Sequence, residues 1–174
     1  LSRQLAYKIV FRKIYEKFGG KIRFFVSGGA PLSPKIIKFL RNANLTILEG
    51  YGLTETNGPC AVNPIRKQLP GTVGLPIGDV MIKLAEDGEV LIKSQALFKE
   101  YLKNPDETME NLKDGWFYSG DIGEITKEGH LKITERKKDI IITAGGKNVA
   151  PQKIENMMKT RKYISNCMVI GDKR

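Results

Sequence analysis

The hydrophobic pattern of this chain changes its period near residue 70, and this change constrains the fold more than any other feature. Before it, short apolar runs alternate with amphipathic helical segments, which is typical of parallel strands joined by helices. After it, apolar and polar residues alternate with a period of two, which is typical of antiparallel strands. The pattern therefore predicts an α/β fold with an α/β unit over about 1–60 and a β-rich, barrel-like subdomain over about 70–137.

Turn and capping residues organise the first part into one parallel crossover unit. Gly19 and Gly20 end the first helix, while Ser33 and Pro34 supply the N-cap and first turn of the second. The expected elements are a helix over residues 1–18, a strand over 22–26, a helix that carries Ile36, Ile37 and Leu40, and a strand over 45–48. This order places the loops that follow the two strands at the same edge of a parallel sheet.

The second part is predicted to consist mainly of hairpins. Asp87-Gly88 is among the stronger hairpin signals. The expected elements are strands over 80–85 and 90–93, a helix from Asn104-Pro105, a hairpin of strands 116–125 and 130–134, a strand over 140–143, a helix from Pro151 and a strand over 164–170. We expect His130 on the surface at a hairpin turn, and Cys167 in the core within the last strand.

The formal net charge of +10 at pH 7 raises the question of a polyanionic partner. The charge is uneven, at +9 over residues 1–41, −6 over 42–130 and +7 over 131–174. In the basic ends the charges alternate with apolar positions at helical spacing, so solvated helix faces explain them better than a nucleic-acid surface. A basic module that binds nucleic acid or an acidic membrane is kept as an alternative from a different functional class.

The chain lacks the marks of a membrane-spanning or disulfide-stabilised protein. No segment approaches the ~20 apolar residues of a membrane span, and no signal-peptide core follows the first residues. Cys60 and Cys167 lie 107 positions apart, which is neither a disulfide framework nor a metal spacing. We therefore expect a cytoplasmic protein. The chain begins with Leu rather than Met and stops just after an apolar run, so we expect an internal fragment.

A segment suited to nucleotide chemistry follows the second expected strand, over residues 49–56. Its two glycines allow close backbone approach, and Tyr51 offers a flat ring on which a base could stack. Thr54 can donate to a phosphate oxygen, and Glu55 can supply an oxygen ligand to Mg²⁺. The competing interpretation is a polar turn with a core tyrosine. Likewise, the small-residue loop 27–31 could contact a planar ligand, although the same residues are also typical of an ordinary turn.

A second candidate site comes from the register of the hairpin 116–134. If the hairpin turns at 128–129, Asp121 and Arg136 become cross-strand neighbours. A carboxylate that accepts from two vicinal hydroxyls, steadied by a facing guanidinium, would form a clasp for a diol. The alternative is a surface ion pair worth ~0–1 kcal/mol. A bulge within 120–123 would shift the register.

Taken together, the motifs of the chain resemble those of adenylate-forming enzymes, and most closely those of AMP-forming long-chain fatty acyl-CoA ligases. The resemblance covers essentially all 174 residues. Peptide-synthetase adenylation domains and luciferase-like ligases are the near alternatives. The motifs, in family order, are Ser27-Gly28-Gly29-Ala30-Pro31, Tyr51-Gly52-Leu53-Thr54-Glu55-Thr56, Trp116-Phe117-Tyr118-Ser119-Gly120-Asp121, and Glu135-Arg136-Lys137-Lys138-Asp139 with Gly145-Gly146-Lys147-Asn148.

The resemblance implies a role for each motif. Lys138 would be the hinge between the large N-terminal domain, here 1–137, and a mobile C-terminal lid that begins at 138 and is truncated at 174. The residues implied to bind the nucleotide are Gly28, Gly29, Ala30, Tyr51, Gly52 and Thr54, with Asp121 and Arg136 on the ribose; Glu55 would bind Mg²⁺, and Gly145 and Gly146 would line the path of CoA.

The resemblance also implies a reaction and its substrates. A fatty acid would be activated by ATP, with Mg²⁺, as an acyl-adenylate and then transferred to CoA. The family's phosphate loop and its adenylation lysine fall outside the 174 residues, so the chain alone is expected to be inactive. Peripheral membrane association of the parent enzyme is left open, as are its oligomeric state and acyl-chain length, and no nucleic-acid partner is expected.

Overall fold

The computed structural model describes residues 10–143 and 145–171. Its internal contacts divide the chain into two compact units whose segments interleave along the sequence. The first unit comprises Leu1–Met81, Ser94–Lys99 and Ile125–Lys132, and the second comprises Ile82–Lys93, Glu100–Glu124 and Ile133–Arg174. The expected domain boundary at residue 138 stays a prediction.

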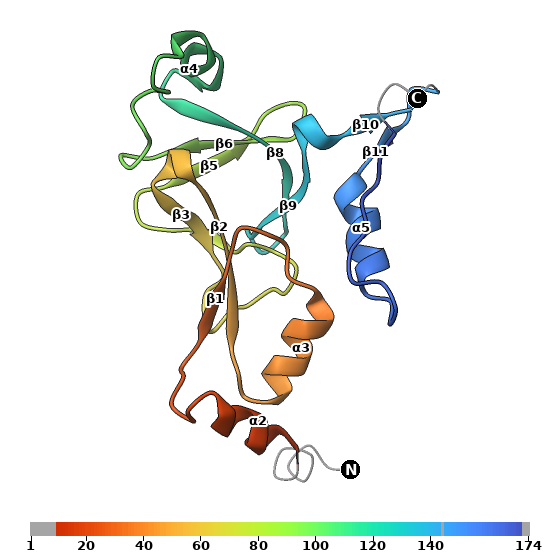
Figure 1. The fold of residues 1–174 in the computed structure, drawn as a ribbon. Helices are drawn as coiled ribbons and strands as arrows, with labels where there is room; N and C mark the ends of the chain where they lie inside the picture. Colours follow the sequence, from red (N-terminus) through yellow and green to blue (C-terminus); the bar gives the residue numbers. More distant parts are fainter. Residues whose placement is uncertain (1–9, 144, 172–174) are drawn as a thin grey trace. The chain divides into compact units, whose positions relative to one another are not determined.

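The first unit is built on a four-stranded sheet in the order β1-β2-β3-β4 (Figure 1). β1 and β2 are parallel, and β3 and β4 continue the sheet antiparallel. The expected parallel crossover is therefore confirmed, with α3 as the crossing helix. The elements are α2 (Arg12–Lys17), β1 (Phe25–Ser27), α3 (Pro34–Asn42), β2 (Ile47–Leu53), the 3-10 helix η2 (Thr54–Thr56), β3 (Gly58–Val62) and β4 (Leu75–Pro76).

Local signals account for the ends of the helices in this unit. Ser33 is the extended N-cap of α3 and Pro34 its first residue, while Ile37 is the residue that α3 buries in the core. Gly19 follows α2 with a φ of 83°, a conformation that glycine adopts without steric cost. Most of the expected helix over 1–18 lies outside the described residues or precedes α2.

Two strands of the first unit differ from expectation. β1 is shifted towards the C-terminus relative to 22–26, and β2 runs on to Leu53 instead of ending at 48. The extension has a tertiary cause, because η2 and the left-handed Asn57 turn the chain back so that β3 pairs with β2. The segment expected to be a loop after the strand is therefore largely strand.

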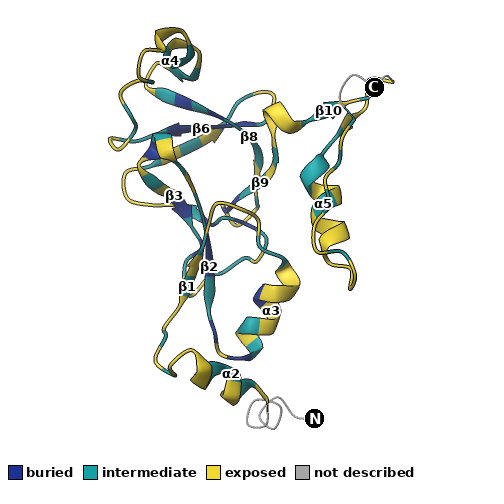
Figure 2. Ribbon diagram, viewed as in Figure 1, coloured by how far each residue is buried: buried dark blue, intermediate teal, exposed yellow. Residues whose placement is uncertain are grey.

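The second unit is an antiparallel sheet in the order β5-β6-β8-β7, with β9 paired to β8. Its buried apolar residues include Val90, Ile92 and Phe117, which Figure 2 shows as dark blue segments of β6 and β8. The predicted Asp87-Gly88 turn is confirmed, with Gly88 at φ 83°. The elements are β5 (Met81–Leu84), β6 (Glu89–Lys93), α4 (Pro105–Asn111), β7 (Leu112–Lys113), β8 (Trp116–Ile125) and β9 (Leu131–Arg136).

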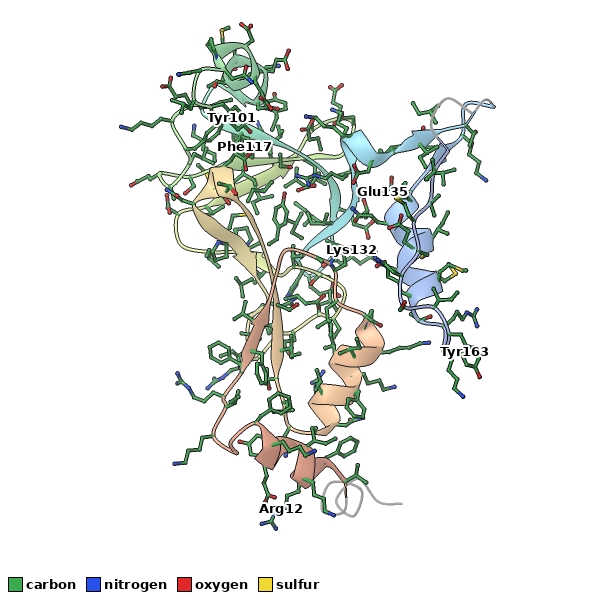
Figure 3. All side chains as sticks on the ribbon, in the orientation of Figure 1. Arg12, Tyr101, Phe117, Lys132, Glu135 and Tyr163 are labelled. Carbon is green, nitrogen blue, oxygen red and sulfur yellow. The ribbon has the colours of Figure 1, made fainter. Side chains whose placement is uncertain are left out.

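The C-terminal segment forms a small hairpin and a helix. Its elements are η3 (Lys137–Asp139), β10 (Ile141–Ile142), β11 (Asn148–Val149) and α5 (Pro151–Lys159). The predicted strand over 164–170 is wrong, because that described stretch pairs with no strand and is irregular. Cys167 is consequently half-buried rather than in the core, and its thiol donates to the Glu155 carbonyl oxygen at 3.3 Å. Figure 3 shows Tyr163 projecting outward from the loop after α5, where it is 89% exposed.

The expectation of a surface histidine is also wrong. His130 is 3% exposed, and its Nε2 lies 3.0 Å from the Lys67 carbonyl oxygen. The reason is non-local, because the backbone of Val73 and Gly74 bonds to that of Leu131 and brings the 64–74 loop over the hairpin.

Within the described residues, no helix is both long and apolar enough to cross a membrane.

Candidate functional site

The two small-residue segments of the first unit meet at one edge of its sheet. The parallel pairing of β1 and β2 ends at Ser27 opposite Glu49, so the next residues, Gly28 and Gly50, lie side by side. A Cβ on Gly28 would approach the Gly50 carbonyl oxygen to 3.3 Å. Gly29 follows at a φ of 80°. The structure thus brings these two segments together where the parallel pairing of β1 and β2 ends, a position at which open α/β sheets bind ligands.

The segment from Tyr51 to Thr56 is a strand that passes directly into a tight turn. Thr56 is buried, and its hydroxyl lies 2.9 Å from both the backbone nitrogen and the carbonyl oxygen of Leu53 and 2.7 Å from the carbonyl oxygen of Gly58. The Phe98 N–H donates to the Glu55 carbonyl oxygen at 2.9 Å. These bonds hold the turn that presents the exposed Thr54 and the half-buried Glu55. Thr56 belongs to the motif quoted above, but its role in holding the turn was not predicted, although a hydroxyl residue in a turn is a usable signal.

Gly52 is required by strand packing, whatever else it contacts. A Cβ built there would lie 2.1 Å from the Gly58 carbonyl oxygen and 2.7 Å from the Pro59 Cα. The β2–β3 register shifts between Tyr51 and Gly52, which marks a bulge. A purely structural requirement therefore accounts for this glycine, and its contact with a nucleotide stays a prediction.

Glu55 is the residue to consider for Mg²⁺. Among the described residues, no group of three or more His, Cys, Asp or Glu side chains is arranged to hold a metal ion. Mg²⁺ in nucleotide sites is commonly bound by one or two carboxylates together with substrate phosphates and water. A single carboxylate, with Thr54 next to it in the sequence, fits that mode of binding and does not fit an all-protein metal cage.

Glu49, which sequence analysis did not single out, lies buried at the end of the parallel pairing. Its Oε2 accepts the Gly71 N–H at 3.0 Å. Burial raises the pKa of Glu49 above its ordinary value of 4.5, and the Gly71 N–H partly offsets this rise. The carboxylate thus connects β2 to the loop that precedes β4.

In the second unit, the predicted pair of Asp121 and Arg136 is present. Arg136 Nε lies 3.5 Å from Asp121 Oδ1, and the Asp121 side chain is only 11% exposed against 55% for Arg136. The predicted register was nevertheless wrong at the turn, because the Thr126 N–H bonds to the His130 carbonyl oxygen and leaves a three-residue loop. Gly120, at a φ of 71°, lies just before Asp121, in the region where a bulge was considered. The pair forms despite the changed turn.

Backbone and hydroxyl contacts fix the position of Asp121. Ser119 Oγ donates to the Val90 carbonyl oxygen at 2.7 Å and accepts the Asp121 N–H at 3.1 Å. Both Ser119 and Asp121 are buried. Asp121 is thus held in place on β8, while the guanidinium of its partner Arg136 is largely exposed to solvent.

The remaining predicted residues lie after β9. Lys138 is exposed in the middle of η3. Gly145 and Gly146 lie in the turn between β10 and β11, where the Gly146 N–H donates to the Thr143 carbonyl oxygen at 2.8 Å. The predicted residues therefore form two groups, with Gly28 to Glu55 in the first unit and Asp121 to Gly146 in the second. Their roles in binding stay predictions.

The family of the chain follows from comparison with known proteins. The model of the AMP-binding enzyme family matches residues 3–102. The chain is 45% identical over 165 residues to the long-chain-fatty-acid–CoA ligase FadD15 of Mycobacterium bovis, a match that covers 95% of this chain and 28% of that protein. It spans about a quarter of the length of the curated relatives that it matches.

Solved structures show the same fold. A fatty acyl CoA synthetase of Mycobacterium tuberculosis matches with a TM-score of 0.67 and 35% identity, over 88% of this chain and 34% of that chain. The O-succinylbenzoate CoA synthetase of Bacillus subtilis, solved in complex with AMP, matches with a TM-score of 0.83 at 23% identity, over 94% of this chain and 37% of that chain. The predicted α/β fold class is confirmed. Because the family model covers more than half of the sequence, including both glycine loops of the first unit, the chain belongs to the AMP-binding enzyme family.

Proposed function

We propose that the chain is part of an AMP-forming ligase that activates a long-chain fatty acid with ATP and transfers it to CoA. The observation that carries the proposal is the buried Asp121 carboxylate faced by Arg136, which is suited to accept hydrogen bonds from the two hydroxyls of a ribose. The fatty-acid substrate is suggested by the relative from Mycobacterium bovis, whose name is that of a long-chain-fatty-acid–CoA ligase.

In the proposed reaction, the fatty-acid carboxylate attacks the α-phosphate of ATP, giving an acyl-adenylate and pyrophosphate, and the CoA thiolate then displaces AMP. The loop of Gly28, Gly29 and Ala30 would line the adenine, with Tyr51 stacked beside it. Thr54 would donate to a phosphate oxygen. Mg²⁺, held in part by Glu55, would offset negative charge on the phosphates.

The C-terminal segment would serve the second half-reaction. Lys138 would be the hinge between a nucleotide-binding domain ending at 137 and a lid starting at 138, and Gly145 and Gly146 would line the CoA path. We also propose a cytoplasmic location, with peripheral membrane association of the parent enzyme as the alternative.

Asp121→Ala in a full-length ligase that contains this chain tests the proposal. Removing both carboxylate oxygens should weaken ATP binding at least about tenfold, because charge-assisted hydrogen bonds contribute ~1.5–3 kcal/mol. Pyrophosphate exchange with palmitate at varied ATP concentration measures this effect. Asp106→Ala is the matched control, because Asp106 is an exposed carboxylate in the first turn of α4.

Two outcomes would contradict the proposal. If the wild-type enzyme shows no palmitate-dependent pyrophosphate exchange, it does not catalyse the proposed activation of a long-chain fatty acid. If the Asp121→Ala enzyme unfolds at the wild-type temperature and retains wild-type ATP affinity, Asp121 does not bind the ribose.

A further inference from the structure

The Glu89 carboxylate joins two segments that the proposed reaction uses for different purposes. Glu89 begins β6 and is 6% exposed. Its Oε1 accepts the Gly120 N–H at 2.8 Å, and its Oε2 accepts from Lys137 Nζ, also at 2.8 Å. Lys137 Nζ lies in addition 2.6 Å from Asp87 Oδ2. All these residues belong to the second unit.

This arrangement differs from an ordinary surface ion pair. Exposed pairs contribute ~0–1 kcal/mol, but a buried carboxylate must have its charge compensated or it destabilises the fold. Here each oxygen of Glu89 has a separate donor, and one of the donors is a backbone N–H. The two carboxylates raise the pKa of Lys137, while the hydrogen bond from Lys137 holds the pKa of Asp87 below its ordinary value, so Lys137 and Asp87 are both charged at neutral pH.

The two donors lie directly beside candidate functional residues. Gly120 precedes Asp121, and its left-handed φ of 71° lies where the β6–β8 register shifts, between the pairs Glu89–Ile122 and Leu91–Tyr118. Lys137 is the first residue of η3 and precedes the proposed hinge Lys138. The Glu89 side chain therefore holds the backbone just before Asp121, the acid proposed to bind the ribose. It also holds Lys137, at the start of the proposed hinge, beside the Asp87-Gly88 turn.

We propose that Glu89 is a positioning residue that sets the orientation of Asp121 through Gly120 and holds the hinge segment through Lys137. This inference rests on the proposed function, because it concerns the nucleotide site and the lid movement. It goes beyond that function in assigning both effects to one carboxylate that touches no substrate.

Substitutions can separate the two contacts. Glu89→Ala removes both, and Glu89→Gln keeps an oxygen for the Gly120 N–H but loses the charge that holds Lys137. Lys137→Met removes only the tether. Asp87→Asn is the matched control, because Asp87 contacts Lys137 but is half-exposed and makes no contact with Gly120.

Three measurements on the full-length enzyme report these contacts. Hydrogen exchange at the Gly120 amide, followed by mass spectrometry, reports the first contact without need of substrate. AMP affinity reports its consequence for Asp121. The ratio of CoA transfer from supplied acyl-adenylate to pyrophosphate exchange reports the hinge.

We expect Glu89→Ala to accelerate Gly120 exchange at least tenfold and to weaken AMP binding at least fivefold, with Glu89→Gln restoring both to within about twofold of wild type. Lys137→Met and Glu89→Gln should shift the ratio of half-reactions at least threefold while AMP affinity stays within twofold. Asp87→Asn should change Gly120 exchange and AMP affinity less than twofold, because the Gly120 N–H bonds to Glu89.

Unchanged Gly120 exchange in folded Glu89→Ala would overturn the anchoring of Asp121. An unshifted ratio of half-reactions in both Lys137→Met and Glu89→Gln would overturn the tether. If the wild-type enzyme binds no AMP, the proposed function fails and the positioning role fails with it, whereas the exchange measurement still shows whether Glu89 anchors Gly120.

Discussion

At Gly52, strands β2 and β3 approach so closely that no side chain fits between them. The obstacle is backbone, because the built Cβ lies 2.1 Å from the Gly58 carbonyl oxygen. Backbone cannot rotate away as the end of a long side chain can, so a substitution must separate the strands. A glycine in a nucleotide-binding motif can therefore be required by the scaffold before any ligand is considered.

Gly52→Ala is expected to lower the free energy of unfolding by about 1–3 kcal/mol, in the range measured for overpacked sites. Chemical denaturation of the full-length protein without nucleotide measures this change. Gly145→Ala is the control, because a Cβ at Gly145 would meet nothing within 4 Å and its φ is not in the left-handed region. Equal stability of both variants would show that β2 and β3 can separate at little cost.

At the scale of single elements, the turn between β10 and β11 is held by one hydroxyl. Thr143 Oγ1 accepts the Lys147 N–H at 3.1 Å and donates to the Lys147 carbonyl oxygen at 3.2 Å. The Thr143 N–H also bonds to that carbonyl oxygen at 3.0 Å. These bonds join the two ends of the turn that carries Gly145 and Gly146.

Thr143→Val should loosen this turn while it keeps the side-chain volume. If the loop lines the CoA path, CoA transfer should slow about three- to tenfold, since each lost hydrogen bond costs ~1 kcal/mol. Pyrophosphate exchange should change less than twofold. Thr143→Ser keeps the hydroxyl and should retain CoA transfer. Equal losses in both half-reactions would argue against a specific role of this loop in the second step.

At the scale of the whole molecule, the proposed hinge at Lys138 would require η3 to change its backbone conformation. Lys138 lies in the middle of this three-residue element and is exposed, so few packing contacts oppose such a change. Two half-reactions that share one site need different surroundings, and a charged, solvated hinge suits that requirement.

Lys138→Pro should trap one lid orientation, because proline fixes its own φ near ~−65° and restricts the backbone of Lys137. One half-reaction should fall at least tenfold more than the other. Pyrophosphate exchange and CoA transfer from supplied acyl-adenylate measure the two steps, and Lys138→Ala controls for loss of the charge. Small, equal losses in both assays would place the pivot elsewhere.

Features that depend on neighbouring residues could be predicted from the sequence. Asn104 caps α4 by accepting the Glu107 N–H, Ser33-Pro34 begins α3, and Gly88 closes the β5–β6 turn, each as expected. Caps and tight turns are determined by a few consecutive dihedrals and side chains, so their signal lies within a short window of sequence. The residues of the candidate site were predicted from short motifs and from the resemblance that these motifs carry, and their roles stay predictions.

The environment of those residues was decided by the tertiary structure. β2 extends to Leu53 only because β3 returns to pair with it, and His130 is buried only because a distant loop covers its hairpin. Glu89 and Lys137 are 48 positions apart, so no local pattern could pair them. The sequence by itself therefore determined the N-termini of α3 and α4, the β5–β6 turn and the motifs. Strand length, burial and the partners of each charge depended on long-range contacts, whose free energy appears only when the chain is folded.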